Sequence, residues 1–240
     1  MAIHKVLVTG ANGQLGWELA QAAVSFPAFE FVFVDRNAMD LSNPNEFEAI
    51  ITLFAPDAII NTAAYTAVDK AESEKVMAYV INAEAVACLA SIAKDLEIPF
   101  ITYSTDYVFD GWKKTGYVES DIKNPLSVYG ASKAFGEDLI EKVFLNKAAG
   151  KYLILRTSWM YGNGNNFIRN ILQLAKINKQ LKIIQDQCGI PTSADWLAKV
   201  SSDLIFNKRF QLITNDQTTL KPSLHNIRPE INKNIWRKLG

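Results

Sequence analysis

Residues 8–19 read VTGANGQLGWEL, and this stretch decides the fold of the chain. Gly10, Gly13 and Gly16 follow a short apolar run and precede a helical pattern. In such a setting the first glycine permits a tight turn. The second lets backbone N–H groups approach a pyrophosphate, and the third allows a helix to pack closely on a strand. The G-x-x-G-x-x-G spacing therefore predicts a dinucleotide-binding turn, with a glycine-rich turn that binds nothing as the alternative.

Short β-branched runs alternate with helical patterns over the first two thirds of the sequence. Runs that are apolar throughout are typical of strands covered on both faces, so the alternation predicts an α/β fold with a Rossmann-type doubly wound parallel sheet. We expect strands at 5–9, 29–34, 57–61, 99–104 and 152–156. We expect helices near 14–24, 44–54, 72–96 and 127–145, the last opened by Pro125 and capped by Ser127.

The pattern changes after Arg156 to a turn-rich segment, TSWMYGNGNNF. A helix near 166–178 and a short strand at 181–186 are expected beyond it. We therefore predict a dinucleotide-binding domain over residues 1–157 and a small, shortened C-terminal substrate-binding region over residues 158–240.

Composition excludes several classes of function. The 25 basic and 25 acidic residues balance, so no net field attracts nucleic acid or an anionic membrane. Apolar runs are interrupted before about 18 residues, the length of a membrane span, and a cytoplasmic location is expected. The two cysteines, Cys88 and Cys188, and the two histidines, His4 and His225, lack metal or redox spacing, so no metal site is predicted.

An acidic residue, Asp35, ends the second predicted strand. A carboxylate at this place can accept both ribose hydroxyls of an adenosine and repels a 2′-phosphate, which favours NAD over NADP. Arg36 follows it and can pair with that phosphate, so use of both cofactors stays open. Asp35 as an ordinary turn residue is the alternative.

Polar side chains gather where the fourth predicted strand ends. Thr105 and Asp106 follow that strand, and the next helix carries Tyr129 and Lys133 four positions apart, on one face. Such a pair arises easily by chance, so its meaning depends on the cleft around it. A phenol can protonate a carbonyl oxygen while a nicotinamide supplies hydride, and a neighbouring ammonium can lower the phenol's pKa from about 10.

Six ordered motifs carry a resemblance to a known family: TGANGQLG, NTAAYTAVDKAE, YSTDYVFDG, YGASKAFGE, RTSWMYG and DQCGIPTSA. They are similar to those of the extended short-chain dehydrogenases/reductases and, among these, the dTDP-4-dehydrorhamnose reductases. The resemblance implies reduction of the 4-keto group of dTDP-4-dehydro-L-rhamnose with NADH or NADPH. It implies a dTDP-sugar substrate, no nucleic acid or membrane partner, and leaves a homodimer open.

The resemblance also implies roles for individual residues. Tyr129 is the proton donor, Lys133 tunes it and binds the nicotinamide ribose, and Thr105 polarises the keto oxygen or tunes Tyr129. Asp106 and Trp159 contact substrate, with a turn role and simple packing as their alternatives. The further residues implied to contact the cofactor are Gly10, Gly13, Gln14, Leu15, Gly16, Asp35, Asp40, Leu41, Ala64, Tyr65, Thr66 and Tyr103.

Two features bear on the kind of reaction. Related nucleotide-sugar dehydratases carry Asp-Glu after the catalytic threonine, whereas this chain has Asp106 and Tyr107, so ketone reduction is favoured over dehydration. Beyond about residue 205 the chain departs from the family pattern. A non-catalytic, dinucleotide-binding regulatory homologue, or a reductase or epimerase of another nucleotide sugar, therefore remains an alternative.

Overall fold

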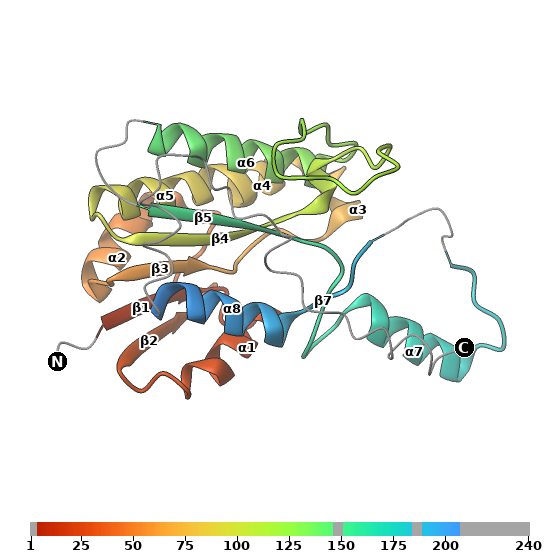
Figure 1. Cartoon of the computed structure of the whole chain (residues 1–240), viewed down its shortest axis with the longest axis horizontal. Helices are drawn as coiled ribbons and strands as arrows, with labels where there is room; N and C mark the ends of the chain where they lie inside the picture. The colour runs from red at the N-terminus through yellow and green to blue at the C-terminus, as the bar shows by residue number, and fades with distance from the viewer. Residues whose placement is uncertain (1–3, 146–150, 184–188, 207–240) are drawn as a thin grey trace.

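A parallel sheet of five strands organises the molecule (Figure 1). The computed structural model describes residues 4–145, 151–183 and 189–206. The strands lie in the order β2-β1-β3-β4-β5, and each neighbouring pair is parallel. Their bounds are β1 His4–Thr9, β2 Phe29–Val34, β3 Ala58–Asn61, β4 Pro99–Thr105 and β5 Lys151–Thr157. The strands predicted at 5–9, 29–34, 57–61, 99–104 and 152–156 and the Rossmann-type fold class are confirmed.

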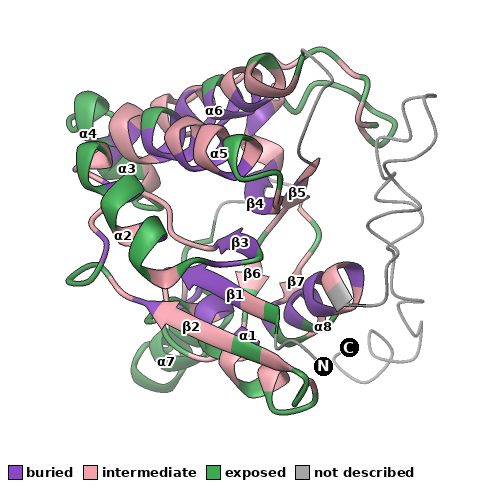
Figure 2. Ribbon diagram, turned by 90° about the vertical axis from the view of Figure 1, so that its left-hand side faces the viewer, coloured by how far each residue is buried: buried purple, intermediate pink, exposed green. Residues whose placement is uncertain are grey.

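Helices cover both faces of the sheet, because successive side chains of a strand point to opposite sides. Val6 and Val8 of β1 pack in one core with α1 (Gln14–Ala23) and α8 (Ala194–Phe206), whereas Leu7 packs in a second core on the other face. The helices of that second face are α2 (Phe47–Phe54), α5 (Ala85–Asp95) and α6 (Val128–Phe144). Figures 1 and 2 show the resulting three layers.

The helix expected over residues 72–96 is divided. A short helix α3 (Val68–Ala71) comes first, and α4 (Lys75–Tyr79) then runs through a π-helical segment η2 (Val80–Glu84) into α5. Residues 75–95 are long and apolar enough to span a membrane, against the expectation that apolar runs are too short. Leu89 and Ala90 are fully buried on the sheet, and a core helix of a globular domain passes the same test.

The remaining short elements are η1 (Pro44–Glu46), η3 (Asp106–Val108), β6 (Met160–Tyr161), α7 (Phe167–Ile177) and β7 (Thr192–Ser193). β6 and β7 form a two-stranded parallel ladder. The strand expected at 181–186 is wrong for residues 181–183, which have no regular structure. Residues 184–186 lie outside the described residues.

The last helix of the described residues, α8, was not predicted as an element, and it packs beside α1 on the sheet. The predicted domain division after residue 157 stays a prediction. Helix α8 follows that residue in the chain but packs with α1 on the sheet that residues 4–157 form. Residues 207–240 of the predicted substrate-binding region, and with them His225, lie outside the described residues, as does Cys188.

The strand order reverses at β1, which has β2 on one side and β3 on the other. In doubly wound sheets ligands bind at the carboxyl ends of the strands beside such a switch point. Thr9 ends β1 and leads directly into the glycine turn. The fold therefore places the turn of residues 10–16 where a dinucleotide is expected.

Candidate active site

The glycine turn has the close approaches that its spacing predicts. Gly10 has a φ of +76°, and a Cβ there would lie 2.7 Å from the backbone nitrogen of Ala63. A Cβ on Gly16 would lie 2.2 Å from the carbonyl oxygen of Gly10. Gly13 is the N-cap of α1, and no side chain of the described residues caps that helix start. The first N–H groups of α1 are therefore suited to an anion such as a pyrophosphate.

The two residues after Gly13 have side chains that are engaged elsewhere. The Oε1 of Gln14 accepts a hydrogen bond from Asn166 Nδ2 at 3.2 Å, and Leu15 is 4% exposed within the core. Of the predicted roles, a contact through the backbone fits Leu15, whereas Gln14 can also offer its amide N–H groups, which the bond from Asn166 does not use.

The acid after β2 is held by the turn that follows it. Asp35 Oδ1 accepts from the backbone nitrogens of Asn37 and Ala38 at 3.0 and 3.2 Å, and Oδ2 accepts from Asn12 Nδ2 at 3.2 Å. Because Asn12 belongs to the glycine turn, Asp35 is both a turn residue and a neighbour of the predicted cofactor site.

The other residues expected around the adenosine differ in exposure. Arg36 is exposed and pairs with Asp40, Nε to Oδ2 at 3.2 Å. The backbone nitrogen of Ser42 also donates to Asp40, and this bond lowers the pKa of the carboxyl. Leu41 is 5% exposed in the core, so its side chain is structural.

The loop after β3 is fixed by a buried amide. Asn82, in η2, accepts from the backbone nitrogen of Tyr65 at 2.9 Å and donates to its carbonyl oxygen at 3.0 Å. Ala64 is half-buried and Thr66 exposed in this loop. The phenol of Tyr65 donates to Glu74 Oε2 at 2.7 Å, which raises the pKa of Tyr65. The three residues lie at the carboxyl end of β3, as predicted.

Tyr129 and Thr105 meet at the same edge of the sheet. Thr105 is the last residue of β4, and its hydroxyl donates to Asp106 Oδ1 at 3.1 Å and accepts from the backbone nitrogen of Tyr107 at 3.2 Å. Burial raises the pKa of Tyr129 to about 12, against the smaller lowering by Thr105. The ring of Tyr107 meets that of Tyr129 edge to face at 5.8 Å.

The local sequence places Tyr129 at the start of α6. Ser127 is the N-cap and its Oγ accepts from the backbone nitrogen of Gly130 at 3.1 Å, which confirms the predicted cap. A Cβ on Gly130 would lie 2.2 Å from the carbonyl oxygen of Tyr107. The glycine therefore lets η3, and with it Asp106, approach the helix start.

Lys133 lies one turn after Tyr129 and is 6% exposed. Its Nζ donates to the carbonyl oxygen of Tyr103 at 3.1 Å, and burial lowers its pKa to about 8. That Lys133, together with a bound nicotinamide, lowers the pKa of Tyr129 stays a prediction. Among the described residues the shift of Tyr129 comes from burial, Thr105, Asp106 and Tyr107, because the Lys133 ammonium is directed to the strand carbonyl instead.

Tyr103 presents its backbone, and not its phenol, to this site. The phenol donates to Ser201 Oγ of α8 at 2.7 Å on the opposite face of the sheet, and burial raises its pKa. Because alternate residues of a strand point to opposite faces, only the backbone of Tyr103 faces Lys133, and its expected contact with the cofactor stays a prediction.

Asp106 and Trp159 lie at the border of the small ladder. Asp106 accepts a hydrogen bond from Thr105, and burial raises its pKa against a smaller lowering by Ser158 and Thr105. Trp159 has a φ of +43° and is 37% exposed, and a Cβ on Gly189 would lie 2.6 Å from its ring. A left-handed conformation of a bulky residue persists where its surroundings hold it, and such residues concentrate at functional sites. The indole of Trp159 is therefore held in place by its neighbours while about a third of the residue stays exposed, so it could still contact a ligand.

Two residues that support this site were missed from sequence. Asn82 donates to Ser132 Oγ at 3.0 Å, and Ser132 Oγ donates to the carbonyl oxygen of Tyr129 at 2.7 Å. A polar residue inside the apolar run of 75–95 was the signal that could have drawn attention to Asn82.

The fold and its glycine turn define a doubly wound protein of the dinucleotide-binding class. The chain belongs to the family described as RmlD substrate binding domain, which it matches over residues 4–217. This match confirms the resemblance predicted from the six motifs.

Known relatives agree with this family. The chain is 44% identical over 195 residues to a dTDP-4-dehydrorhamnose reductase of Burkholderia thailandensis, covering 81% of this chain and 63% of that protein. A crystal structure of a Clostridium acetobutylicum dTDP-4-dehydrorhamnose reductase superposes with a TM-score of 0.79 and 39% identity, covering 85% of this chain and 71% of that one. The crystal structure of the Bacillus anthracis dTDP-4-dehydrorhamnose reductase in complex with NADP superposes with a TM-score of 0.78 and 36% sequence identity. The match again covers 85% of this chain and 71% of that one. The chain thus spans less than two thirds of the curated Burkholderia relative.

Proposed function

We propose that the chain binds NADH or NADPH at the turn of residues 10–16. The uncapped start of α1 and the close approaches at Gly10 and Gly16 support this, because a side chain at either glycine would collide with backbone and force the turn open. Asp35 and Arg36 lie where the adenosine ribose is expected. The similar Bacillus anthracis protein binds NADP, which supports NADPH as one of the cofactors.

We further propose that the site reduces the 4-keto group of dTDP-4-dehydro-L-rhamnose to give dTDP-L-rhamnose. The bound nicotinamide supplies the hydride. The observation that carries the proposal is that the end of β4 brings Thr105 to the start of α6, where Tyr129 has the ring of Tyr107 against it and Lys133 follows one turn later. The names of the similar proteins supply the substrate class.

Tyr129 has the protonation state that a proton donor needs. Its pKa of about 12 keeps the phenol protonated through the physiological range but also makes it a weak acid, so the proposal requires the charges of Lys133 and of the nicotinamide to lower this pKa when the cofactor is bound. Thr105 is proposed to donate to the same oxygen by turning its one hydroxyl proton from Asp106 to the sugar. Lys133, with a pKa of about 8, is mostly an ammonium at neutral pH and can bind ribose hydroxyls.

Tyr107 supports reduction over dehydration. It occupies the position after Asp106 with an aromatic ring against Tyr129, so this position offers no second carboxylate for the removal of a proton from the sugar. Asp106 and the partly exposed indole of Trp159 are proposed to contact the sugar as well.

The test is oxidation of NADH or NADPH, followed by nicotinamide absorbance, with enzymatically prepared dTDP-4-dehydro-L-rhamnose. Cofactor binding is measured in parallel by nicotinamide fluorescence. Turnover that requires the sugar supports the proposal. Normal cofactor binding without turnover would favour a non-catalytic dinucleotide-binding homologue and overturn the reductase proposal.

A further inference from the structure

A buried carboxylate lies one helical turn beyond Lys133. Glu137 is on α6, is 2% exposed, and shares a helix face with Lys133 because the two are four residues apart. Charged side chains are almost never buried unless they are paired. The mechanism proposed above gives this carboxylate no role, so its partners decide what it does.

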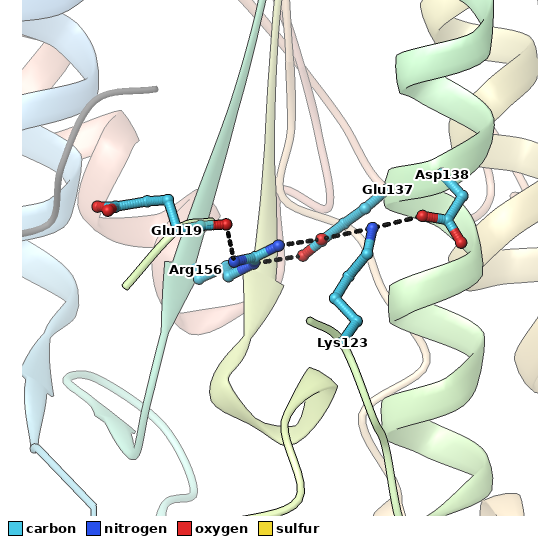
Figure 3. A network of polar contacts seen from close by, with 5 residues as sticks. All are labelled: Glu119, Lys123, Glu137, Asp138 and Arg156. Atoms are coloured by element: carbon cyan, nitrogen blue, oxygen red, sulfur yellow. Dashed lines mark hydrogen bonds and ion pairs between the residues drawn. The ribbon is translucent and has the colours of Figure 1, made fainter. Parts of the chain in front are cut away.

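The partners come from a strand and from a loop (Figure 3). Arg156 of β5 binds Glu137 through two parallel contacts, Nε to Oε1 at 2.9 Å and Nη2 to Oε2 at 2.6 Å. Lys123 Nζ lies 3.3 Å from Glu137 Oε2 and also contacts Asp138. Burial acts to raise the pKa of Glu137, but Arg156 outweighs it and holds the pKa below its usual value.

Arg156 also attaches the 109–124 loop, which leads from η3 to α6. Its Nη1 donates to the carbonyl oxygen of Glu119 at 3.4 Å, and its guanidinium lies 5.1 Å from the ring centroid of Phe109. Phe109 stacks on Tyr117 at 4.3 Å, within the same loop. The loop begins three residues after Asp106, so one ion pair connects α6, β5 and the chain that leaves the candidate site.

Stability alone is a weak reason for this arrangement. A buried ion pair is often no more stabilising than well-packed apolar residues of the same size. Glu137 and Lys133 also line one small cavity, with Asn82, Thr102 and Ser104. The negative charge of Glu137 raises the pKa of Lys133 against the lowering by burial. The cluster thus acts on the group that is proposed to bind the cofactor.

We propose that Glu137 is a positioning residue for the reaction proposed above: held by Arg156 and Lys123, its carboxylate keeps Lys133 in its charged, cofactor-binding state and fixes α6 against the 109–124 loop. Neither Glu137 nor Arg156 needs to touch the cofactor or the sugar in this role. Their effect is transmitted through Lys133 and through the loop.

The elements packed against α6 present several polar or charged groups near Lys133, and each has to be considered as a cause of its pKa shift. Tyr103 of β4 offers a carbonyl oxygen and turns its phenol away, and η2 contributes the neutral Asn82. Asp106 and Tyr107 of η3 act on Tyr129, and Arg156 and Lys123 face Glu137. Within the described part of the chain, the charge that shifts the pKa of Lys133 is that of Glu137.

The test compares Glu137→Gln with Asp138→Asn. Both remove one carboxylate from α6, but the side chain of Asp138 is 48% exposed and is not among the groups that act on Lys133. The affinity for NADPH is measured by fluorescence as a function of pH. In the wild type we expect it to weaken as pH rises through about 8, as Lys133 loses its proton. In Glu137→Gln this midpoint is expected about one pH unit lower, and in Asp138→Asn unchanged.

A double variant, Glu137→Met with Arg156→Met, guards against misfolding of the single variant. It removes both charges, so it is expected to restore the melting temperature but not the midpoint pH. A midpoint at the wild-type pH in either folded Glu137 variant would overturn the proposal. A midpoint pH of NADPH binding that is lowered in both Glu137→Gln and the double variant supports the proposal. If the ion pair were only structural, apolar packing in the double variant would restore the wild-type midpoint as well as the melting temperature.

A second measurement does not need cofactor or substrate. The 109–124 loop contains Lys113 and Lys114, and trypsin cleavage there is expected to accelerate in Glu137→Gln relative to Asp138→Asn. If the wild type binds NADPH but reduces no sugar, the reductase proposal fails while the shift in midpoint pH still decides the role of Glu137. If the wild type binds no NADPH, the cleavage rate decides, and equal rates in the two variants overturn the proposal.

Discussion

Substitution of Gly136 by alanine tests how closely α6 must approach the π-helical segment. A Cβ on Gly136 would lie 2.2 Å from the carbonyl oxygen of Asn82 and 3.3 Å from the Cα of Ala83. Both atoms are backbone, so no flexible side chain can turn aside. The helix and η2 must separate by about 1 Å before the contact becomes ordinary, and a close-packed interior resists such a shift.

Two opposing effects set the magnitude. Overpacking a core costs about 1–3 kcal/mol, whereas replacing glycine by alanine inside a helix contributes about 1 kcal/mol. We take the upper half of that cost because the contact is with backbone, which leaves about 1–2 kcal/mol of destabilisation. For a domain of this size, the melting temperature then falls by roughly 2–8 °C.

The catalytic effect is expected to be larger than the loss of stability. Asn82 holds Tyr65 on one side and Ser132 on the other, and Ser132 holds the carbonyl oxygen of Tyr129. A shift of η2 from α6 therefore displaces the cofactor loop and the proton donor relative to each other. Misplacement by about 1 Å can cost ~10²-fold in rate, so we expect kcat to fall by about 10- to 100-fold.

The assay pairs thermal unfolding with turnover of NADPH and the nucleotide sugar. The control is Gly116→Ala, where a Cβ has no atom of the described residues within 4 Å and φ is not positive. We expect the control to retain wild-type stability and rate. A Gly136→Ala protein with the wild-type melting temperature and kcat would refute the reasoning, because α6 and η2 would then tolerate separation without consequence.

Three further outcomes follow from the site. Tyr129→Phe should lower the chemical rate by ~10²-fold or more with unchanged cofactor affinity, as loss of a general acid does; an unchanged single-turnover rate would remove Tyr129 from that role. Tyr103→Phe should cost about 1 kcal/mol of stability, the bond to Ser201, while kcat stays the same, so a large drop in kcat would place the phenol in the site after all. Cofactor affinity in the wild type should be highest below pH of about 8 and fall above it, because Lys133 is an ammonium below its pKa; binding that is flat through this pH contradicts the assignment.

The sequence by itself determined the parts of this protein that depend on local pattern. Fully apolar runs and the spacing of Gly10, Gly13 and Gly16 were sufficient for the sheet and for the turn after β1. Ser127 was predicted as the cap of α6 because capping is a contact between near neighbours in the chain. The resemblance of the six motifs was sufficient for the family.

Other features were decided by the tertiary structure, because they depend on segments far apart in the sequence. α8 lacked a distinct signal, and its place became evident from its packing on α1. The direction of the Tyr103 phenol was not predicted, because its partner, Ser201, lies 98 residues away. Period-two alternation along β4 could have warned of this, since Tyr103 is two residues from the core residue Ile101.

The environment of the Tyr129 and Lys133 pair was also beyond the sequence. Spacing placed both on one face of α6, but the direction of each pKa shift depends on burial and on the atoms that reach each group. Lys133 contacts a strand carbonyl, and Glu137 is paired with Arg156 on β5, 19 residues further along the chain. Local sequence thus fixes which groups a helix presents, whereas the charges and carbonyls that set their chemistry arrive from other elements and are defined by the packed structure.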